Sequence, residues 1–409
     1  MATLRPFPAV MPPGTKANLV AQPPYDVVNR QEAAALAAGN AIGFMRVARA
    51  EIELPESVDA YDDCVYEKAL ENYQRLCREV PLTADAPPSF YVYSLVMNGH
   101  RQTGVAAAAS VDDYDAEIIK KHEKTRQTKE DDRTRHIMTL RSQTGPVFLT
   151  YRDSAAIDEI VARTMGATPL FDFVADDGVG HTGWRVAAAD TDALGQAFTD
   201  IPSLYIADGH HRAASASRAR ASLKKANPNH TGEEEYNGFL TVTFPASQLH
   251  ILPYNRVVFD LNGLTPQSLL DAAGKAFDVS KADSASPDSP GTVHLYVEKE
   301  WWRLSYKGDA SALSPVDRLD VSLLQDLLLA PILGIDDPRT SKRIDFVGGI
   351  RGTAELEARV DSGEAKVALS MYPTTIEQLM DIADDNDIMP PKSTWFEPKL
   401  RDGLFCHDI

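Results

Sequence analysis

Apolar residues along this chain switch between helical spacing and the shorter spacing of strands. Four large apolar side chains recur at helical spacing and predict a helix over 59–79. Two strand-like runs, SFYVYSLVM and RQTGVAAAASV, are joined by Asn98-Gly99, a dipeptide typical of two-residue β-hairpins. The alanine-rich run after PPYDVV predicts a further helix, for which Asp26 or Asn29 can serve as the cap.

The same alternation of helix and strand patterns continues to the end of the chain. A polar, helix-like stretch over 112–143 precedes the apolar strand PVFLTY. Composition shifts near residue 258, and the tail from about 315 again reads helix, strand, helix, strand, helix. These patterns predict a mixed α/β (α+β) fold with at least two lobes.

Composition and charge narrow the class of protein. Hydrophobic residues make up 44% and charged residues 24%, which excludes a disordered chain or a disulfide scaffold. The net charge of −18 disfavours nucleic acid and anionic membranes as partners, but it leaves small anionic substrates open. No apolar run is long enough for a spanning helix, and prolines interrupt the N-terminus where a signal peptide needs apolar residues. With only Cys64, Cys77 and Cys406 present, we expect reduced thiols in a cytoplasmic protein.

The segment SLYIADGHHRAASASRARASLKKA carries the most informative pattern. SLYIA predicts a short buried strand, Asp208-Gly209 a sharp turn, and the remainder a helix. The backbone N–H groups at such a helix N-terminus favour an anion. His210, His211 and Arg212 add donors that suit phosphate, so we expect a loop for phosphate binding and phosphoryl transfer. In the alternative interpretation Asp208 only caps the helix and the histidines are packing or surface residues.

A second candidate is the run Lys121-His122-Glu123-Lys124-Thr125. It is not the zinc motif HExxH, because position 126 is arginine. A glutamate beside histidine and basic residues can act as a general base or hold Mg²⁺. The alternative is a solvated, charged helix, and no metal ligand set is assigned.

Two other motifs are less specific. The literal GxGxxG over 178–183 precedes a strand-like run instead of a helix, so we expect a hairpin loop and no dinucleotide site. A cationic set near the C-terminus either gathers around an anionic ligand or pairs with the many carboxylates. Its members are Arg339, Lys342, Arg343, Arg351, Lys392 and Lys399.

Five segments, in this order, resemble a bacterial family known as a domain of unknown function. They are PPYDVV, KKHEKTRQTKEDDR with GPVFLTY, IADGHHRAASA, HILPYNRVV and MPPKSTWFEPKL. The DGHHR core of that family is similar to the free-serine kinases, which belong with ParB and sulfiredoxin in one superfamily. The resemblance implies a ParB/sulfiredoxin-like core over 89–260, preceded by an α-rich segment (1–88) and followed by a C-terminal α/β lobe (261–409).

The resemblance also implies a function. It points to a small-molecule kinase that uses Mg²⁺ and ATP (or ADP) to convert free L-serine to O-phosphoserine. Glu123 matches the glutamate proposed as base toward the serine hydroxyl. The loop that holds the nucleotide phosphates and the transferred phosphoryl group matches Asp208, Gly209, His210, His211 and Arg212. Of these, Asp208, His210 and His211 join Glu123 as expected catalytic residues, and His122, Thr125 and Arg212 are expected to contact the substrate.

Two other functions stay open from the sequence. The same loop could serve a nucleotide-binding regulatory protein without kinase activity. It could also serve a hydrolase of phosphate esters, in which water replaces the acceptor hydroxyl. The oligomeric state is not readable from the sequence.

Overall fold

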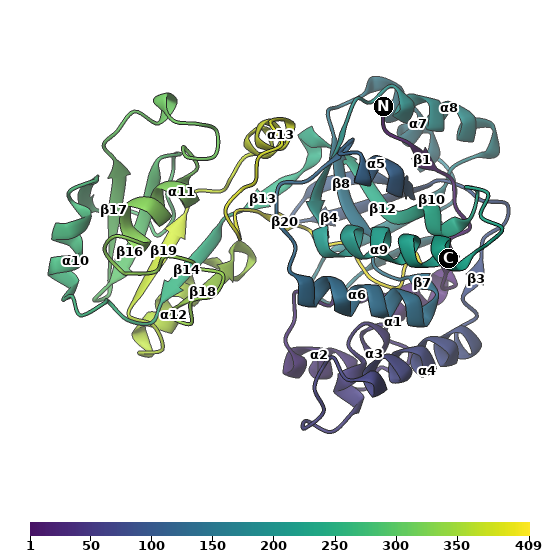
Figure 1. Ribbon diagram of the computed structural model, residues 1–409, viewed down its shortest axis with the longest axis horizontal. Coiled ribbons are helices and arrows are strands. Elements are labelled where there is room, and N and C mark those ends of the chain that lie inside the picture. Colours follow the sequence, from purple (N-terminus) through teal and green to yellow (C-terminus); the bar gives the residue numbers. More distant parts are fainter. The chain divides into compact units, whose positions relative to one another are not determined.

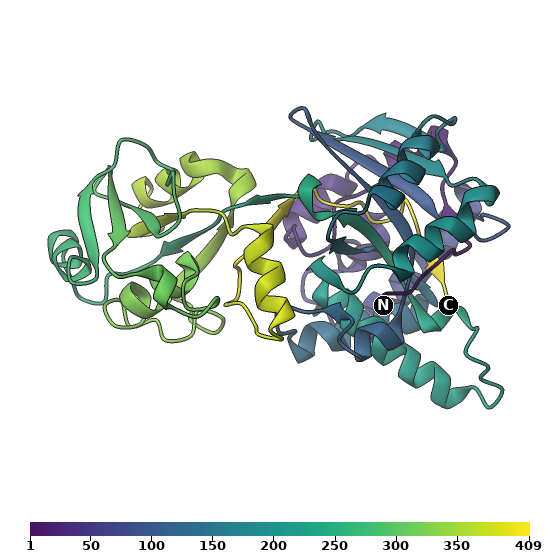
Figure 2. The same ribbon diagram turned by 90° about the horizontal axis from the view of Figure 1, so that it is seen from above.

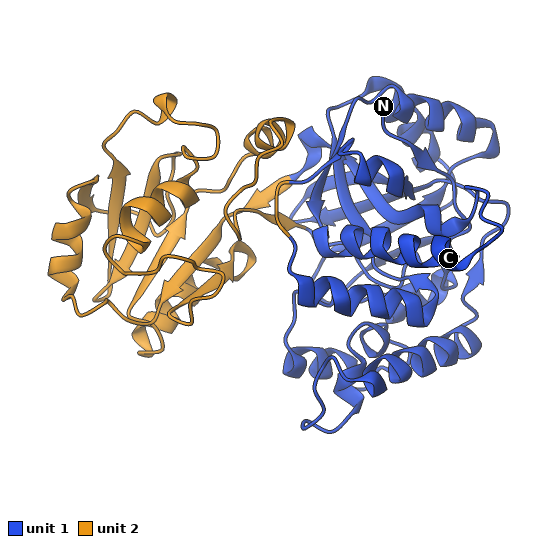
Figure 3. Ribbon diagram, in the orientation of Figure 1, with its two compact units in different colours: residues 1–121, 125–249, 398–409 blue, residues 122–124, 250–397 orange.

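The computed structural model describes residues 1–409, which form two compact units (Figure 3). The first unit contains residues 1–121, 125–249 and 398–409, and the second contains 122–124 and 250–397. The chain leaves the first unit and returns to it, so that both termini belong to the first unit (Figure 2). The three-part division predicted at 88 and 260 stays a prediction.

A mixed nine-stranded sheet forms the centre of the first unit (Figure 1). Its strand order is β6-β11-β8-β12-β5-β4-β10-β9, with β1 pairing β5. The strands are β1 (Leu4–Arg5), β4 (Tyr91–Met97), β5 (His100–Ser110), β6 (Ile119–Lys120), β8 (Val147–Tyr151), β9 (Phe171–Val174), β10 (Gly180–Arg185), β11 (Leu204–Asp208) and β12 (Gly238–Pro245). Only the β11–β6 and β12–β8 pairs are parallel. Two small antiparallel pairs add β2 (Val10–Met11) with β3 (Thr83–Ala84), and β7 (Ser142–Gln143) with β21 (His407–Asp408).

Nine helices belong to the first unit. They are α1 (Ala17–Val20), α2 (Arg30–Ala37), α3 (Met45–Ala48), α4 (Asp63–Glu79), α5 (Val111–Asp115), α6 (Gln127–Leu140), α7 (Ala155–Met165), α8 (Ala188–Thr199) and α9 (His210–Ala226). Alternate residues of the central strands pack with α7, α8 and α9 in one apolar core, as the two-residue period of strands requires. A second core joins α3 and α4 to Leu140 at the end of α6, and α6 packs along α9 (Figure 1).

The opposite face of the sheet is covered in part by the C-terminal segment. Tyr91 and Tyr93 point away from the core that holds Val92, because side chains alternate along β4. The ring of Phe405 lies 5.4 Å from that of Tyr91 and 5.7 Å from those of Tyr93 and Phe171. Aromatic side chains of this size dominate the energetics of a core, so the C-terminal segment stabilises the first unit.

The second unit has a six-stranded antiparallel sheet of order β15-β17-β16-β19-β14-β18. Its strands are β14 (Tyr254–Val258), β15 (Phe277–Lys281), β16 (Thr292–Val297), β17 (Glu300–Tyr306), β18 (Ile344–Gly348) and β19 (Val367–Met371). Its helices are α10 (Pro266–Ala273), α11 (Asp320–Leu324), α12 (Gly352–Asp361) and α13 (Ile376–Asp384). The chain enters this unit through β13 (His250–Leu252) and leaves it through β20 (Trp395–Glu397), and these two strands pair with each other.

The mixed α/β fold predicted from the sequence is confirmed, as are most of its local elements. The Asn98-Gly99 hairpin forms between β4 and β5, with both turn residues at positive φ. Asn29 caps α2 in a full capping box, and the GxGxxG segment lies in the β9–β10 hairpin. No helix combines the length and the apolarity that crossing a bilayer requires.

The long helix-like stretch expected over 112–143 is wrong. It is divided into α5, the short strand β6, a loop over 121–126 and α6. Glu117 at φ 58° ends the first helical turn, and β6 then pairs with β11. A polar composition is typical of loops as well as of solvated helices, so the composition of this stretch does not distinguish the two.

Truncation of Phe405 tests whether the C-terminal segment stabilises the first unit. We expect Phe405→Ala to lower the free energy of unfolding by about 3–5 kcal/mol, the usual cost of removing a buried phenylalanine ring. Urea denaturation followed by far-UV circular dichroism measures this change. Val174→Ala is the control, because Val174 is 69% exposed and its truncation should change stability by less than about 0.5 kcal/mol. Equal stability of the two variants would contradict the role given to Phe405.

Candidate functional site

The predicted strand, turn and helix around Asp208 are all present. β11 ends at Asp208, Gly209 turns the chain, and α9 begins at His210. Gly209 has φ +96°, a backbone conformation that favours glycine, and a Cβ there would lie 3.1 Å from Nε of Arg212. Glycine therefore meets two requirements at this position, a left-handed turn and close packing over the Arg212 guanidinium.

A β-bulge just before the turn sets the direction of Asp208. Ile206 pairs with Leu149 of β8 and Asp208 pairs with Phe148, so β11 contains one extra residue. Bulges of this kind redirect side chains next to functional sites. The α9 N-terminus has no side-chain cap, so the interpretation of Asp208 as a helix cap is wrong.

Asp208 forms an ion pair with Lys399 instead. The Lys399 Nζ donates to Asp208 Oδ2 at 3.0 Å, and Nη2 of Arg212 lies 3.9 Å from Asp208 Oδ1. The side chains of Lys399 and Asp208 are only 12% and 26% exposed. Burial alone would raise the pKa of Asp208, but Lys399 and then Arg212 outweigh it and hold that pKa below its usual value. Two cations thus flank the Asp208 carboxylate at the start of α9.

The two histidines of the turn occupy different environments. His210 is buried at the first position of α9, whereas His211 accepts a hydrogen bond from the Arg126 backbone N–H at its Nε2, over 3.0 Å. Because a backbone amide can only donate, His211 Nε2 is unprotonated and Nδ1 carries the proton. Burial lowers the pKa of His211, which agrees with a neutral ring that donates through Nδ1.

The expected substrate residues lie in the loop between β6 and α6. Thr125 belongs to the first unit and donates its hydroxyl to Glu130, which also accepts from Arg218 at 3.3 Å. His122 and Glu123 belong to the second unit, where the His122 carbonyl accepts from the Met389 N–H at 2.9 Å. The charged-helix alternative for this run is wrong, because the segment is not helical.

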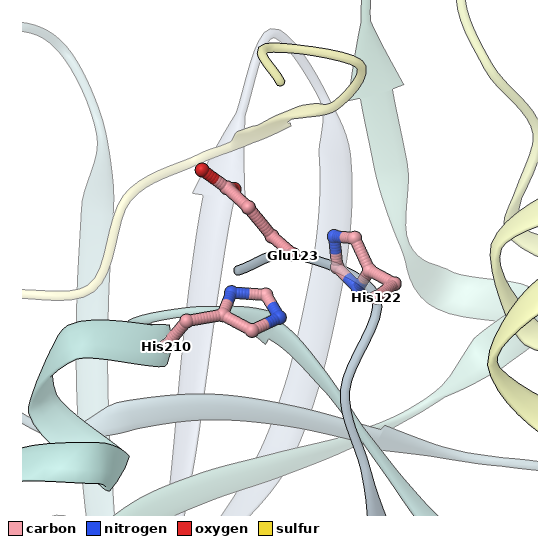
Figure 4. A group of neighbouring side chains, drawn as sticks. All are labelled: His122, Glu123 and His210. Carbon is pink, nitrogen blue, oxygen red and sulfur yellow. The ribbon is translucent and has the colours of Figure 1, made fainter. Parts of the chain in front are cut away.

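Figure 4 draws His122 and Glu123 on the loop after β6, together with His210 at the start of α9. These side chains carry imidazole nitrogens and a carboxylate, which are ligand types for divalent metals. Mg²⁺ prefers oxygen ligands, so among these three only Glu123 suits it.

A cavity of about 40 Å³ lies at the same end of the central strands as Asp208. It lies where the segments leading into β8 and β12 meet α6, the start of α9 and the C-terminal segment. The polar groups that line it are Tyr25, Arg133, His136, Gln143, Thr144, Arg212 and Asp402. Arg212 therefore contacts both Asp208 and this cavity.

Asp402 is the charged group of the cavity that the sequence analysis missed. It is 4% exposed, and its Oδ1 accepts no hydrogen bond. Burial raises its pKa to about 7, although Arg212 lowers it. A Cβ on Gly145 would lie 2.5 Å from this oxygen, so glycine is required for the close approach of the carboxylate. Nothing in the local pattern around Asp402 marks it, because its partners come from distant parts of the chain.

The ion pairs of the C-terminal cations agree with the second alternative that the sequence left open, pairing with carboxylates. Arg339 pairs with Asp337 and Arg343 with Asp260, as expected for cations that neutralise surface carboxylates. Lys399 pairs with Asp208 of the DGHHR turn.

Fold and site together define a mixed α/β protein with a glycine turn and a cationic helix N-terminus suited to an anion. A family model described as "Protein of unknown function (DUF1015)" matches residues 4–322, well over half of the chain. The chain belongs to this family, which confirms the family resemblance seen in its motifs. The segment MPPKSTWFEPKL lies beyond the matched residues.

Solved structures give more distant likenesses, and no curated protein matches. A conserved hypothetical protein from Pyrococcus furiosus is 14% identical, with a TM-score of 0.36 over 75% of this chain and 94% of that one. A free serine kinase in complex with AMP is 11% identical, with a TM-score of 0.38 over 75% and 91%. SbnI from Staphylococcus aureus, with a C-terminal truncation, is 11% identical, with a TM-score of 0.40 over 74% and 85%.

Removing the cation that neutralises Asp208 should destabilise the first unit. We expect Lys399→Met to cost about 2 kcal/mol, between the values for exposed and fully buried pairs that lose one partner. The Lys399→Met/Asp208→Asn double variant should recover part of that loss, because no carboxylate is then left unpaired. Denaturant unfolding of both variants at pH 7 measures the difference. A double variant less stable than Lys399→Met would contradict the pairing.

Asp402 should make stability depend on pH near neutrality. Its folded pKa of about 7 lies above the ordinary value of 3.8, so the folded state binds the proton more tightly. Its contribution is fully present below about pH 4 and is lost as the pH rises toward 7, by about 4 kcal/mol in total. His136, with its pKa lowered to about 3, acts in the opposite direction, so the comparison is with Asp402→Asn, which keeps His136.

Unfolding free energies of the native chain and of Asp402→Asn, measured from pH 4.5 to 8, provide the test. We expect their difference to shift in favour of the variant as the pH rises. A difference independent of pH would show that Asp402 titrates near its ordinary value.

Proposed function

We propose that this protein is a kinase that transfers a phosphoryl group from ATP, or ADP, to the hydroxyl of free L-serine. The observation that carries the proposal is the turn from Asp208 to Arg212, where a left-handed glycine opens a 17-residue helix without a side-chain cap. The positive end of a helix dipole and its N–H groups favour phosphate at this position. The resemblance of the DGHHR segment to free-serine kinases supplies the acceptor.

Charge at the turn supports phosphoryl transfer. Lys399 and Arg212 place two positive charges beside Asp208, and neutral His211 can donate through Nδ1. Phosphoryl transfer requires positioning and neutralisation of the phosphate oxygens more than covalent chemistry. We assign Gly209, His210, His211 and Arg212 to the phosphates, and Asp208 to the orientation of Lys399 and Arg212.

Glu123 is proposed as the general base. Two peptide units separate it from Thr125 and span at most about 7 Å. The next residue, Arg126, is hydrogen-bonded to His211, so the covalent chain ties Glu123 to the loop end beside the turn. His122 and Thr125 are assigned to substrate contacts on the same loop.

In the proposed reaction, the serine hydroxyl oxygen forms a bond to the terminal phosphorus as the bond to the bridging oxygen of the nucleotide breaks. The hydroxyl proton passes to the Glu123 carboxylate, and the nucleotide leaves with one phosphate fewer. Mg²⁺, when bound, neutralises the phosphate oxygens. Asp208 already binds Lys399, so we expect the cation to be held chiefly by the nucleotide phosphates.

The proposed compartment is the cytoplasm, and the proposed partners are small molecules. All three cysteines are free thiols, as in reducing compartments. The net charge of −18 disfavours polyanionic partners.

Glu123→Gln tests the base. We expect transfer from labelled ATP to L-serine to fall by about 10²–10⁴-fold, the usual contribution of a general base, while nucleotide binding is retained. Phosphoserine is detected directly, with ADP and pyrophosphate as alternative donors. The matched control is Glu117→Gln, which removes an exposed carboxylate that pairs with Lys121 just before the same loop and should keep full activity.

Other outcomes of the transfer assay would support a different function. Nucleotide binding without transfer to serine would indicate a regulatory protein. Release of inorganic phosphate without phosphoserine would indicate a hydrolase. Full activity of Glu123→Gln would remove Glu123 from the site.

A further inference from the structure

The cavity next to the DGHHR turn is lined by a buried guanidinium and a buried carboxyl group, each with unused hydrogen-bonding capacity. Arg212 is 9% exposed and its Nε donates no hydrogen bond; Asp402 is 4% exposed and its Oδ1 accepts none. Both side chains line the same cavity of about 40 Å³. Buried polar atoms are almost always satisfied in folded proteins, so a pair like this points to a ligand.

We propose that this cavity binds the head group of a free L-amino acid, with the α-ammonium on Asp402 and the α-carboxylate on Arg212. This inference rests on the proposed function, and it names the part of the site that recognises the acceptor. The Arg212 fork matches a carboxylate, and an ammonium gives Asp402 a charged donor.

Charge favours a zwitterion over an ion of either sign. An anion such as phosphate would satisfy Arg212 but would require Asp402 to stay protonated, because two anions would otherwise lie against each other. A simple cation would satisfy Asp402 but would lie against Arg212. A zwitterion pairs both groups and adds no net charge to a buried space, where unpaired charge is costly.

The neighbouring cation does not take over the role of Arg212. Arg133 is already bound to Asp132 through Nε and Nη2, at 2.9 and 3.0 Å, and its guanidinium lies 4.1 Å from the centre of the Tyr25 ring. The Nη1 of Arg212 donates to the Pro146 carbonyl, which holds the guanidinium in place, and its Nε has no hydrogen-bond partner within the protein.

The size of the cavity sets which part of the amino acid enters it. The cavity of about 40 Å³ has room for only a few water-sized groups, so no more than the head group of the amino acid enters it. The amino-acid side chain then lies outside. Because Arg212 also lies 3.9 Å from Asp208, a hydroxyl one carbon from Cα would be close to the turn.

Binding of an ammonium group beside Asp402 should release a proton, which can be measured. Its pKa of about 7 means that it carries a proton in the empty cavity below neutral pH, and an adjacent ammonium would displace that proton. The titratable and charged groups that face Asp402 are Arg212 on α9, Arg133 and His136 on α6, and Tyr25 and Asp26 before α2. Among these, His136 stays neutral at pH 6 because its pKa is near 3.

Calorimetric titrations of the full chain at pH 6, in two buffers of different ionisation enthalpy, test this proposal. We expect L-serine and L-alanine to bind with release of close to one proton. 3-Hydroxypropionate, which lacks the ammonium, and ethanolamine, which lacks the carboxylate, should bind at least tenfold more weakly. Equal binding of L-serine and 3-hydroxypropionate would overturn the assignment of Asp402.

Two variants sharpen the experiment. Asp402→Asn should abolish proton release and weaken L-alanine binding at least tenfold, and Gly145→Ala should weaken binding because its Cβ would meet Asp402 Oδ1. Asp177→Asn is the matched control, since Asp177 pairs with Arg401 outside the cavity lining and its loss should leave binding unchanged. Because the ligand series uses the native chain, the test does not depend on the folding of any variant.

The outcomes separate this inference from the proposed function. Amino-acid binding with proton release but no phosphoryl transfer would keep the cavity assignment and reject the kinase. Transfer to a hydroxyl compound that lacks an ammonium, without amino-acid binding, would keep the kinase and overturn the assignment. No binding of any of the four ligands at 10 mM or so would show a cavity that holds ordered water only, and would overturn it as well.

Discussion

The carboxylate of Asp208 stands at the end of a buried strand, where a negative charge is costly without a cation. Lys399 supplies that cation from 191 residues further along the chain. The pair requires the chain to return from the second unit to the first, and residues 398–409 make that return. The same short segment contributes Phe405 to the aromatic packing against β4 and Asp402 to the cavity. One electrostatic requirement therefore couples the site to the packing of the first unit.

Local pattern was sufficient to predict the turn that carries the site. The apolar run before Asp208, the glycine after it and the alanine-rich helix each depend on neighbours in sequence, and all three formed as expected. The Asn98-Gly99 hairpin was predictable for the same reason. In contrast, the run around Glu123 was read as part of one helix, because charged residues fit loops and helices alike. Tertiary pairing of β6 with β11 decided that segment.

Long-range charge pairing was beyond sequence reasoning. The sequence left open whether the C-terminal cations bind a ligand or pair with carboxylates, and the structure pairs Arg343 and Lys399 with aspartates in different parts of the chain. Arg343 neutralises Asp260 within the second unit, whereas Lys399 neutralises a residue of the DGHHR turn. The sequence around Asp402 gives no indication of its role. Only its burial and its close approach to Gly145 distinguish it from other acidic residues. Such features depend on which distant segments fold together.

Arg212 is the residue through which the two parts of the proposed site are connected. Its guanidinium packs beneath Gly209, is anchored on the Pro146 carbonyl, lies 3.9 Å from Asp208 and lines the cavity that contains Asp402. A single planar cation can face a phosphate on one side and a carboxylate on the other only if its own position is fixed, and this anchoring fixes it. The adjacent carboxylates then have distinct tasks: the Asp208 pKa is depressed by two cations, whereas burial raises that of Asp402. Two carboxylates with opposite pKa shifts around one arginine would give the proposed phosphate position and the proposed head-group position different surroundings beside the shared guanidinium.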